Sequence, residues 1–394
     1  MIRRRRADAG DGPPLWVDGA AVPRPPLDGD TTADVVVVGG GLTGLWTAYY
    51  LLDADPALDV LVVEAGVTGQ DERGVGACSA RAGLTADALA ARHSRTAAAH
   101  ARALLRDAVV EVGGVAAVEE IDCGFAFGGE LVLAADDDAL TRLERQAASA
   151  QRWGDETHVL DAAGLRERVL VDDAVGGTWS PEAARLDPGR LARGLAGVLV
   201  ARAARIADRT PAARVVDQAV VTPHGTVRAA TVVDTRPEAP ELRAWAATLA
   251  TAPLPDATWA RIGLADAEVL AHGDGLRVVR TPDGRLVAGR ARPGAPRLVR
   301  ALDALLRPPA SATALHDLLV DLLPVLTDAP VTHAWLRPLA ASGALPSVGH
   351  VPGATWARSG GTGPAAANVA GRTVAELITG TASELATAPW VRRA

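Results

Sequence analysis

Three glycines at a set spacing are the residues in this chain best suited to bind a phosphate. Gly39, Gly41 and Gly44 form a G-x-G-x-x-G pattern within ADVVVVGGGLTGLWTAYYLL. In this pattern the first glycine permits a tight turn, the second lets a pyrophosphate approach the backbone, and the third allows a helix to pack closely on a strand. The N–H groups at the start of the helix would bind the phosphates. We expect Gly40 and Thr43 to share the loop.

An acidic residue follows at the distance that a dinucleotide site requires. Glu64 lies 20 residues after Gly44, at the end of a second apolar run. A carboxylate there can accept both hydroxyls of an adenosine ribose, and it repels a ribose 2′-phosphate. The pattern predicts a dinucleotide site. Two alternatives stay open from these residues, a nicotinamide-dependent dehydrogenase and a glycine-rich turn in an ordinary α/β sheet.

The elements that must position these residues form a βαβ unit. Residues 34–38 and 59–63 are continuous apolar runs, typical of strands buried on both faces, and residues 42–52 between them have a helical pattern. Such strands are expected to be parallel, with a right-handed crossover. Helical patterns also cover later segments, at 85–120, 136–153, from 188 onward, 315–326 and 364–378. Hairpins are predicted around turns at 128–129, 223–225 and 282–284.

Composition excludes several classes of function. The 394 residues carry a net charge of −7 without a basic face, which argues against a nucleic-acid partner. No apolar run reaches membrane-spanning length, and the initial RRRR is not followed by the apolar core of a signal peptide, so we expect a cytoplasmic protein without membrane partners. Cys78 and Cys123 lack metal-ligand spacing, so no metal is expected. None of the eight histidines, His333 included, belongs to a Ser-His-Asp pattern.

The chain resembles the FAD-dependent oxidoreductases of the D-amino-acid oxidase and glycine oxidase superfamily. Within it, the γ-glutamylputrescine oxidoreductase-like amine oxidases are the most similar. The likeness spans nearly the whole chain, through the opening glycine stretch, GACSARAG, LDPGRLARGLA, RTPDGRLVAG and LPSVGHVPGATWARSGGTGPAAANVAGRTVAELITG. The resemblance implies non-covalent FAD and oxidation of a primary or secondary amine, an amino acid or a polyamine derivative. The product imine would hydrolyse, and dioxygen is one candidate electron acceptor.

The resemblance also implies further cofactor residues. Ser79 and Arg81 would flank the pyrophosphate or the flavin ring, and the turn Gly361, Thr362 and Gly363 would face the ring. A glycine turn before a helix start favours negative charge, which the reduced ring gathers. From the residues alone, the ordinary start of a C-terminal helix is the preferred interpretation of this turn.

One segment concerns the substrate. AWLRPLA is similar to the family segment whose arginine anchors the substrate carboxylate, and Arg337 matches that arginine. A planar guanidinium suits bidentate binding of a carboxylate. Trp335, two residues earlier, is expected to contact the substrate as well. The alternative for Arg337 is a surface salt bridge.

The sequence departs from the family pattern at both ends of the expected flavin site. Ala80 and Ala82 surround Arg81 where the family has other residues, and the closing turn contains threonine where the subfamily often has histidine. Asp234 would repel a pyrophosphate unless Arg236 pairs with it. These departures support a second hypothesis, a degenerate family member that serves as a non-catalytic flavin-binding or scaffolding subunit.

The predicted fold class is α/β, with a Rossmann-like FAD-binding domain interrupted by an α+β substrate domain that contains an antiparallel sheet. Tyr49 and Tyr50 are expected in the core, and Trp16 is expected to pack an N-terminal arm on the surface. The predicted boundaries are an arm at 1–32, FAD-binding parts at 33–115, 185–245 and 341–385, and substrate-domain parts at 116–184 and 246–340.

Overall fold

The computed structural model describes most of the chain: residues 12–17, 22–81, 85–216, 218–236, 244–273, 275–290, 312–339, 345–351, 354–358 and 363–393. Its helices are α1 (Leu42–Ala54), α2 (Ala86–Arg92), α3 (Arg95–Val118), α4 (Asp137–Arg152), α5 (Ala162–Arg166), α6 (Pro188–Ala201), α7 (Asp256–Trp259), α9 (Ala312–Leu322) and α10 (Pro364–Thr379), with 3-10 turns η1 (Leu15–Val17), η2 (Pro324–Leu326) and η3 (Leu385–Thr387).

The strands make two large sheets and one small one. They are β1 (Thr31–Val38), β2 (Val60–Val63), β3 (Ala77–Ser79), β4 (Ala126–Phe127), β5 (Glu130–Ala134), β6 (His158–Asp161), β7 (Gly176–Ser180), β8 (Ala183–Arg185), β9 (Arg205–Ala207), β10 (Arg214–Val216), β11 (Ala219–Thr222), β12 (Gly225–Asp234), β13 (Ala244–Thr251), β14 (Val269–His272), β15 (Leu276–Arg280), β16 (Leu286–Arg290), β17 (Val331–Leu339), β18 (Ser347–Val351), β19 (Ala354–Arg358) and β20 (Val391–Arg393).

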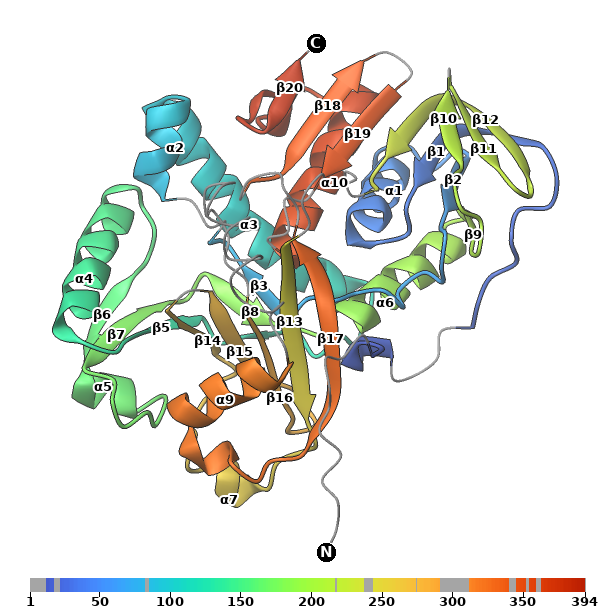
Figure 1. The fold of residues 1–394 in the computed structure, drawn as a ribbon. Coiled ribbons are helices and arrows are strands. Elements are labelled where there is room, and N and C mark those ends of the chain that lie inside the picture. The colour runs from blue at the N-terminus through green and yellow to red at the C-terminus, as the bar shows by residue number, and fades with distance from the viewer. Residues whose placement is uncertain are drawn as a thin grey trace, which may run out of the picture.

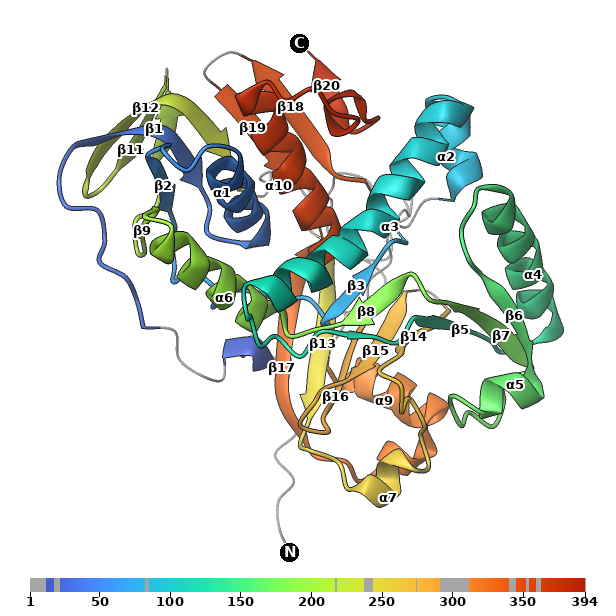
Figure 2. The ribbon, with the colours of Figure 1, turned by 180° about the vertical axis from the view of Figure 1, so that it is seen from behind.

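Within the described residues, the first large sheet has nine strands in the order β20-β18-β19-β12-β1-β2-β9, with the β10–β11 hairpin attached to β12. The second has eight strands in the order β17-β13-β16-β15-β14-β5-β7-β6. Both views show the small β3-β8-β4 sheet lying between the two (Figures 1 and 2). The chain passes from one large sheet to the other several times, as expected for one domain interrupted by another.

The nine-stranded sheet confirms the predicted βαβ unit. β1 pairs in parallel with β2 on one side and with β12 on the other. Val35 and Val37 pack on the face covered by α1, α6 and α10, whereas Val36 and Val38 pack on the opposite face. All four are at most 3% exposed, because both faces of the strand are covered.

The two faces of the eight-stranded sheet have different partners. The face that we call outer packs on α9, through a cluster that includes Leu270 and Leu315. The inner face packs against Trp16 of η1 and Ala77 of β3, in a cluster that includes Trp335. Most of the strand pairs are antiparallel, as predicted, and β14–β5 is a parallel pair.

One expectation about local structure was wrong, and a second was confirmed with a break between two helices. The predicted hairpin around residues 128–129 does not form, because β4 pairs with β8 while β5 pairs with β7 and β14. Gly129, at φ +77°, redirects the chain from one sheet to another instead. The helical stretch 85–120 is divided into α2 and α3, because the Ser94 hydroxyl caps a new helix through the N–H of Ala97.

Two predicted hairpins and the burial of three aromatic side chains were confirmed. Hairpins form at residues 223–225, between β11 and β12, and at 282–284, between β15 and β16. Tyr49 and Tyr50 lie in the core, 6% and 9% exposed. Trp16 is 4% exposed and fixes the N-terminal arm. No helix of the described residues could cross a membrane, and no metal-binding cluster of acidic, His or Cys side chains occurs among them.

The fold class is therefore the predicted one, a mixed α/β structure with a Rossmann-like part and a second part built on an antiparallel sheet. The exact domain boundaries given above stay predictions.

Candidate functional site

The glycine loop has the geometry of a phosphate cradle. Gly39 has φ +112°, a backbone conformation that side chains rarely allow. A Cβ atom on Gly44 would lie 2.0 Å from the carbonyl oxygen of Gly39, so only glycine lets α1 approach the end of β1 this closely. Gly41 is the N-cap of α1. Thr43 lies in the first turn of α1, 8% exposed, where helical N–H groups have no partner within the helix.

Glu64 follows β2 and is held against the glycine loop. Its Oε2 accepts a hydrogen bond of 2.6 Å from the N–H of Gly40, and its Oε1 accepts one of 2.7 Å from the N–H of Gly66. The structure thus brings together the loop and the carboxylate that the spacing predicted for the ribose end of the site.

A second carboxylate, which the sequence analysis did not single out, lies at the same helix start. Oε1 of Glu72 accepts a hydrogen bond of 3.2 Å from the N–H of Leu42, the first residue of α1. Apart from the neighbouring residues in the chain, the same oxygen is the one atom of the described residues within 4 Å of a Cβ built on Gly41. Burial, with smaller contributions from Asp71 and Glu64, raises the pKa of Glu72 to about 7. A carboxyl group, which carries its full negative charge only above about pH 7, therefore stands where a helix N-terminus binds anions.

The charges at residues 234–236 are paired. The Arg236 guanidinium forms a bidentate contact with Asp234, at 3.0 Å from Nε to Oδ1 and 2.8 Å from Nη2 to Oδ2. Thr235, between them, donates its hydroxyl to the carbonyl of Val38 at 2.9 Å and so supports the glycine loop. Arg236 therefore forms the pair with Asp234 that would offset repulsion between Asp234 and a pyrophosphate. Glu238 lies outside the described residues.

Ser79 and Arg81 converge on a buried carboxylate of the second sheet. The Ser79 hydroxyl donates to Oε2 of Glu130 at 3.1 Å, and the Nε of Arg81 lies 3.5 Å from the same oxygen. Arg277 of β15 approaches Oε1 of Glu130 at 3.0 Å. Burial alone would raise the pKa of Glu130, which is 2% exposed, but Arg277 and Arg81 hold it below the ordinary value. Two guanidinium groups thus face one carboxylate, leaving a net positive charge.

A second buried ion cluster fixes the backbone beside Arg81. Arg102 of α3, 5% exposed, donates from Nη1 to the carbonyl of Ala80 at 2.7 Å. Its Nη2 lies 2.9 Å from Asp155 and 3.4 Å from Glu182. The residue before Arg81 is thereby held by a rigid, charged side chain from a helix that is distant in sequence.

The start of α10 lies against β3. Gly363 is the N-cap of α10, at φ +91°, and a Cβ there would be 2.9 Å from the carbonyl oxygen of Ala77. The thiol of Cys78 lies close to the N–H of Ala365, in the first turn of α10, and burial raises its pKa to about 12. The structure therefore places β3, which ends at Ser79, beside Gly363, the last residue of the turn expected at the flavin ring. Gly361 and Thr362 of that turn lie outside the described residues.

The two predicted substrate residues lie in β17. Trp335 is 1% exposed and donates from Nε1 to the carbonyl of Arg73 at 3.1 Å, so packing accounts for it and contact with substrate stays a prediction. Arg337 pairs in the strand register with Ala246 of β13. Its side chain is outside what the structure describes. His333, also in β17, contacts the Thr332 hydroxyl through Nδ1.

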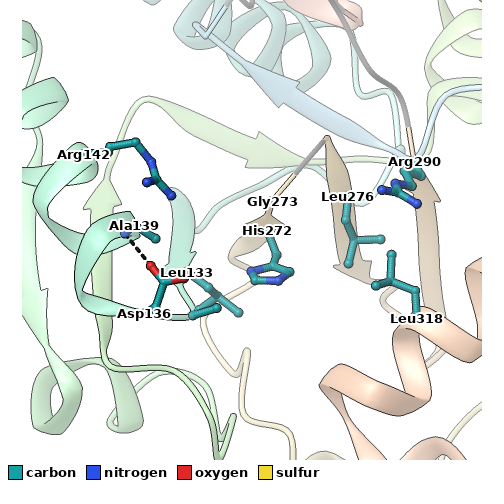
Figure 3. A pocket seen from close by; sticks show the side chains of 10 residues that line it. Leu133, Asp136, Ala139, Arg142, His272, Gly273, Leu276, Arg290 and Leu318 are labelled. Atoms are coloured by element: carbon teal, nitrogen blue, oxygen red, sulfur yellow. Dashed lines mark hydrogen bonds between the residues drawn. The ribbon is translucent and has the colours of Figure 1, made fainter. Parts of the chain in front are cut away.

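A pocket of about 360 Å³ lies on the other side of the second sheet. Its lining includes Arg142, His272 and Arg290, which Figure 3 shows around a hollow between α4, the ends of β14 and β16, and α9. Leu133 and Leu276, also in the lining, belong to the cluster on the outer face. The sheet therefore separates this pocket from β3 and the glycine loop, and we do not assign it to the cofactor site.

Comparison with known proteins identifies the family. The family model DAO, described as FAD dependent oxidoreductase, matches residues 34–377. The chain belongs to this family of FAD-dependent oxidoreductases. No curated protein matches the sequence of the chain.

Solved structures of DAO-like proteins share the fold. An L-amino acid deaminase from Proteus myxofaciens is 15% identical, with 97% of each chain covered and a TM-score of 0.72. A glycine oxidase from Geobacillus kaustophilus is 20% identical, with 91% of this chain and 98% of that chain covered and a TM-score of 0.72. An FAD-bound L-alpha-glycerophosphate oxidase from Mycoplasma pneumoniae is 15% identical, with 88% and 95% covered and a TM-score of 0.66. At such identities the likeness concerns the fold alone.

The glycine loop fits the ADP half of FAD, the cofactor of the DAO family. The close contact at Gly44, the start of α1 at Gly41 and the carboxylate of Glu64 are features that a dinucleotide requires, and the Glu72 side chain is the one group described here that stands in its way. Sequence reasoning missed Glu72, Glu130 and Arg277, whereas it had singled out Arg81, the other arginine that pairs with Glu130. A lone acid in the apolar run of β5 was the available signal for Glu130, and we find none for Glu72.

Proposed function

We propose that this chain is an FAD-dependent oxidoreductase that oxidises a primary or secondary amine, an amino acid or a polyamine derivative, to an imine that water hydrolyses. The observation that carries the proposal is the glycine loop with Glu64 bound to it, in a chain of the DAO family. Bound flavin would accept the hydride of the amine, and the protein would supply position and electrostatics. Dioxygen is the acceptor to test first, and the cytoplasm stays the proposed location.

The residues of the ADP end have distinct proposed roles. Gly39, Gly41 and Gly44 allow the pyrophosphate to approach the first turn of α1, where the N–H groups would bind it non-covalently. Glu64 would accept the ribose hydroxyls while keeping its bond from Gly40. Gly40 and Thr43 complete the loop.

The flavin and substrate ends are proposed from the neighbourhood of β3. Ser79 and Arg81 follow Ala77, whose carbonyl lies against Gly363 at the start of α10. We therefore assign them, with the turn from Gly361 through Thr362 to Gly363, to the flavin end. The net positive charge shared by Arg81 and Arg277 would stabilise negative charge on a reduced ring or on a bound carboxylate. This chemistry favours a substrate with an acidic group.

Arg337 is the proposed anchor for that acidic group, with Trp335 beside it in β17. Within the family, the sequence resemblance favours the γ-glutamylputrescine oxidoreductase-like amine oxidases. Polyamine derivatives should therefore be tried together with amino acids.

The visible spectrum of the purified protein tests the function directly. We expect a yellow protein whose flavin absorbance is lost anaerobically on addition of an amino acid or polyamine derivative. Arg337→Ala should raise the half-saturating concentration of a carboxylate substrate at least about tenfold, and Arg337→Lys by less, because the lysine keeps the charge without the bidentate fork. A colourless protein that refuses added FAD would overturn the proposal.

A second candidate is a non-catalytic, flavin-binding or scaffolding member of the family. The observation in its favour is the Glu72 carboxylate at the start of α1, which opposes an incoming pyrophosphate. A yellow protein that no amine bleaches would support this candidate over the first.

A further inference from the structure

We propose that Glu72 is an internal competitor of the cofactor: its carboxylate binds the N-terminus of α1, and FAD gains that position only when Glu72 releases Leu42. The proposal rests on the function proposed above, because it concerns the same cofactor site. It assigns to Glu72 a control of cofactor loading, which the glycine motif by itself does not contain.

The geometry puts the carboxylate and a pyrophosphate in the same place. Oε1 of Glu72 accepts a hydrogen bond of 3.2 Å from the N–H of Leu42. The same atom lies 3.8 Å from the position that a Cβ on Gly41 would occupy. The second glycine of a G-x-G-x-x-G loop is the one over which the pyrophosphate passes, and the first helical N–H groups are the donors that it uses. A pyrophosphate in that position would meet a carboxylate oxygen and would lack one of its donors.

The competing side chain is presented by a firmly held backbone. The carbonyl of Arg73 accepts the Nε1 hydrogen of Trp335 at 3.1 Å, and the carbonyl of Gly74 accepts that of Trp16 at 2.7 Å. Arg73 also donates from Nη1 to the carbonyl of Leu336 at 2.9 Å. Because the residues after Glu72 are attached to η1 and β17, we infer that release requires rotation of the Glu72 side chain rather than removal of the whole segment.

The charges around Glu72 increase the conflict. Glu64 and Asp71 are the acidic groups that face it, and both add negative potential at the start of α1. Arg73, the next residue in the sequence, pairs with Asp71 at 2.6 Å. A pyrophosphate would therefore bring its charge next to an existing group of carboxylates, which like-charge repulsion disfavours.

Ligand titrations of the cofactor-free full chain test the competition. Glu72→Gln keeps the shape and removes the charge, and Glu72→Ala removes the side chain. Asp71→Asn is the matched control, because it removes the same charge from the neighbouring residue, which is 78% exposed and has no bond to α1. Affinities for FAD, ADP and adenosine are measured by equilibrium dialysis, and FAD also by quenching of flavin fluorescence.

Both Glu72 variants should bind FAD and ADP at least about tenfold more tightly than the unaltered chain, and Asp71→Asn should stay within about threefold. Adenosine, which lacks the pyrophosphate, should bind equally to all forms. Unchanged or weaker ADP binding in both Glu72 variants would overturn the proposal, as would an equal gain for adenosine or for Asp71→Asn. Tighter ADP binding with no FAD binding by any form would leave the competition intact and overturn the proposed function instead.

Discussion

The Oε2 atom of Glu64 lies 2.6 Å from the backbone nitrogen of Gly40, so the end of β2 and the glycine loop are joined by a charge-assisted hydrogen bond. The other carboxylate oxygen binds the N–H of Gly66. Two backbone donors therefore fix this side chain before any ribose is bound, and the loss of its charge should affect cofactor binding more than folding.

Glu64→Gln should weaken FAD binding by roughly tenfold to a hundredfold, because an amide can accept only one of the two backbone hydrogen bonds and presents a donor to the other. Riboflavin, which lacks the adenosine, is the control ligand and should bind equally to both forms. Dialysis equilibrium constants measure the difference. Equal FAD affinity in the two forms would show that Glu64 has no part in holding the ribose.

Gly44→Ala should destabilise the protein by about 1–3 kcal/mol and abolish tight FAD binding, because the new methyl group would lie 2.0 Å from the Gly39 carbonyl and force the helix away from β1. Gly197→Ala is the matched control, since that helical position has open space around it. It should stabilise the protein by about 0.5–1 kcal/mol. Thermal unfolding of both variants checks the contrast, and equal shifts would contradict it.

Arg277→Met should cost about 1–3 kcal/mol at pH 7, because the buried Glu130 carboxylate keeps only Arg81 as its ionic partner. The pKa of Glu130 is held below its ordinary value, so this pair stabilises the fold above about pH 4.5 and stops doing so as the pH falls through the folded-state pKa. The cost should therefore shrink in acid. Urea unfolding at pH 7 and pH 4 measures it, and the double variant Glu130→Gln, Arg277→Met should be less destabilised than Arg277→Met.

Glu72 gives the cofactor-free protein a pH dependence of the opposite sign. Its pKa is raised from 4.5 to about 7, so the folded state holds a proton that the unfolded chain releases. Stability from this group is fully present below pH 4.5 and is lost as the pH rises toward about 7, a loss of about 3 kcal/mol at most. The glutamine of Glu72→Gln does not titrate, so the free energy of unfolding of this variant should lack this pH dependence. The free energies of unfolding of the two forms, plotted against pH, should therefore differ in slope. Parallel curves between pH 4.5 and 7.5 would contradict the assignment.

The sequence was most informative about structural features that are determined by residues close together in the chain. The tight turn of the glycine loop and the helices that begin at Pro188 and Pro364 all follow from local patterns, and the structure confirms these conformations. Their signals are strong because backbone conformation and capping are decided within a few residues. The same is true of the two hairpins with Pro and Gly in their turns.

Features that depend on distant contacts could not be predicted in this way. Gly128-Gly129 resembles a hairpin turn, yet Gly129 donates its N–H to Ala183 and the chain enters a different sheet. Glu130 receives partners from β3 and β15, 51 residues before it for Ser79 and far after it for Arg277. No local pattern carries such pairings, because they arise only when the sheets are assembled.

Trp16 has a consequence for where the folded unit begins. The family match starts at residue 34, but the indole of Trp16 is 4% exposed and donates to the Gly74 carbonyl, and a Cβ atom on Gly189 would collide with this residue. A recombinant version trimmed to the family match would lose this wedge between the two halves, at a cost of about 3–5 kcal/mol. The segment needed for a stable protein therefore begins before residue 34, where the family match begins, and includes Trp16.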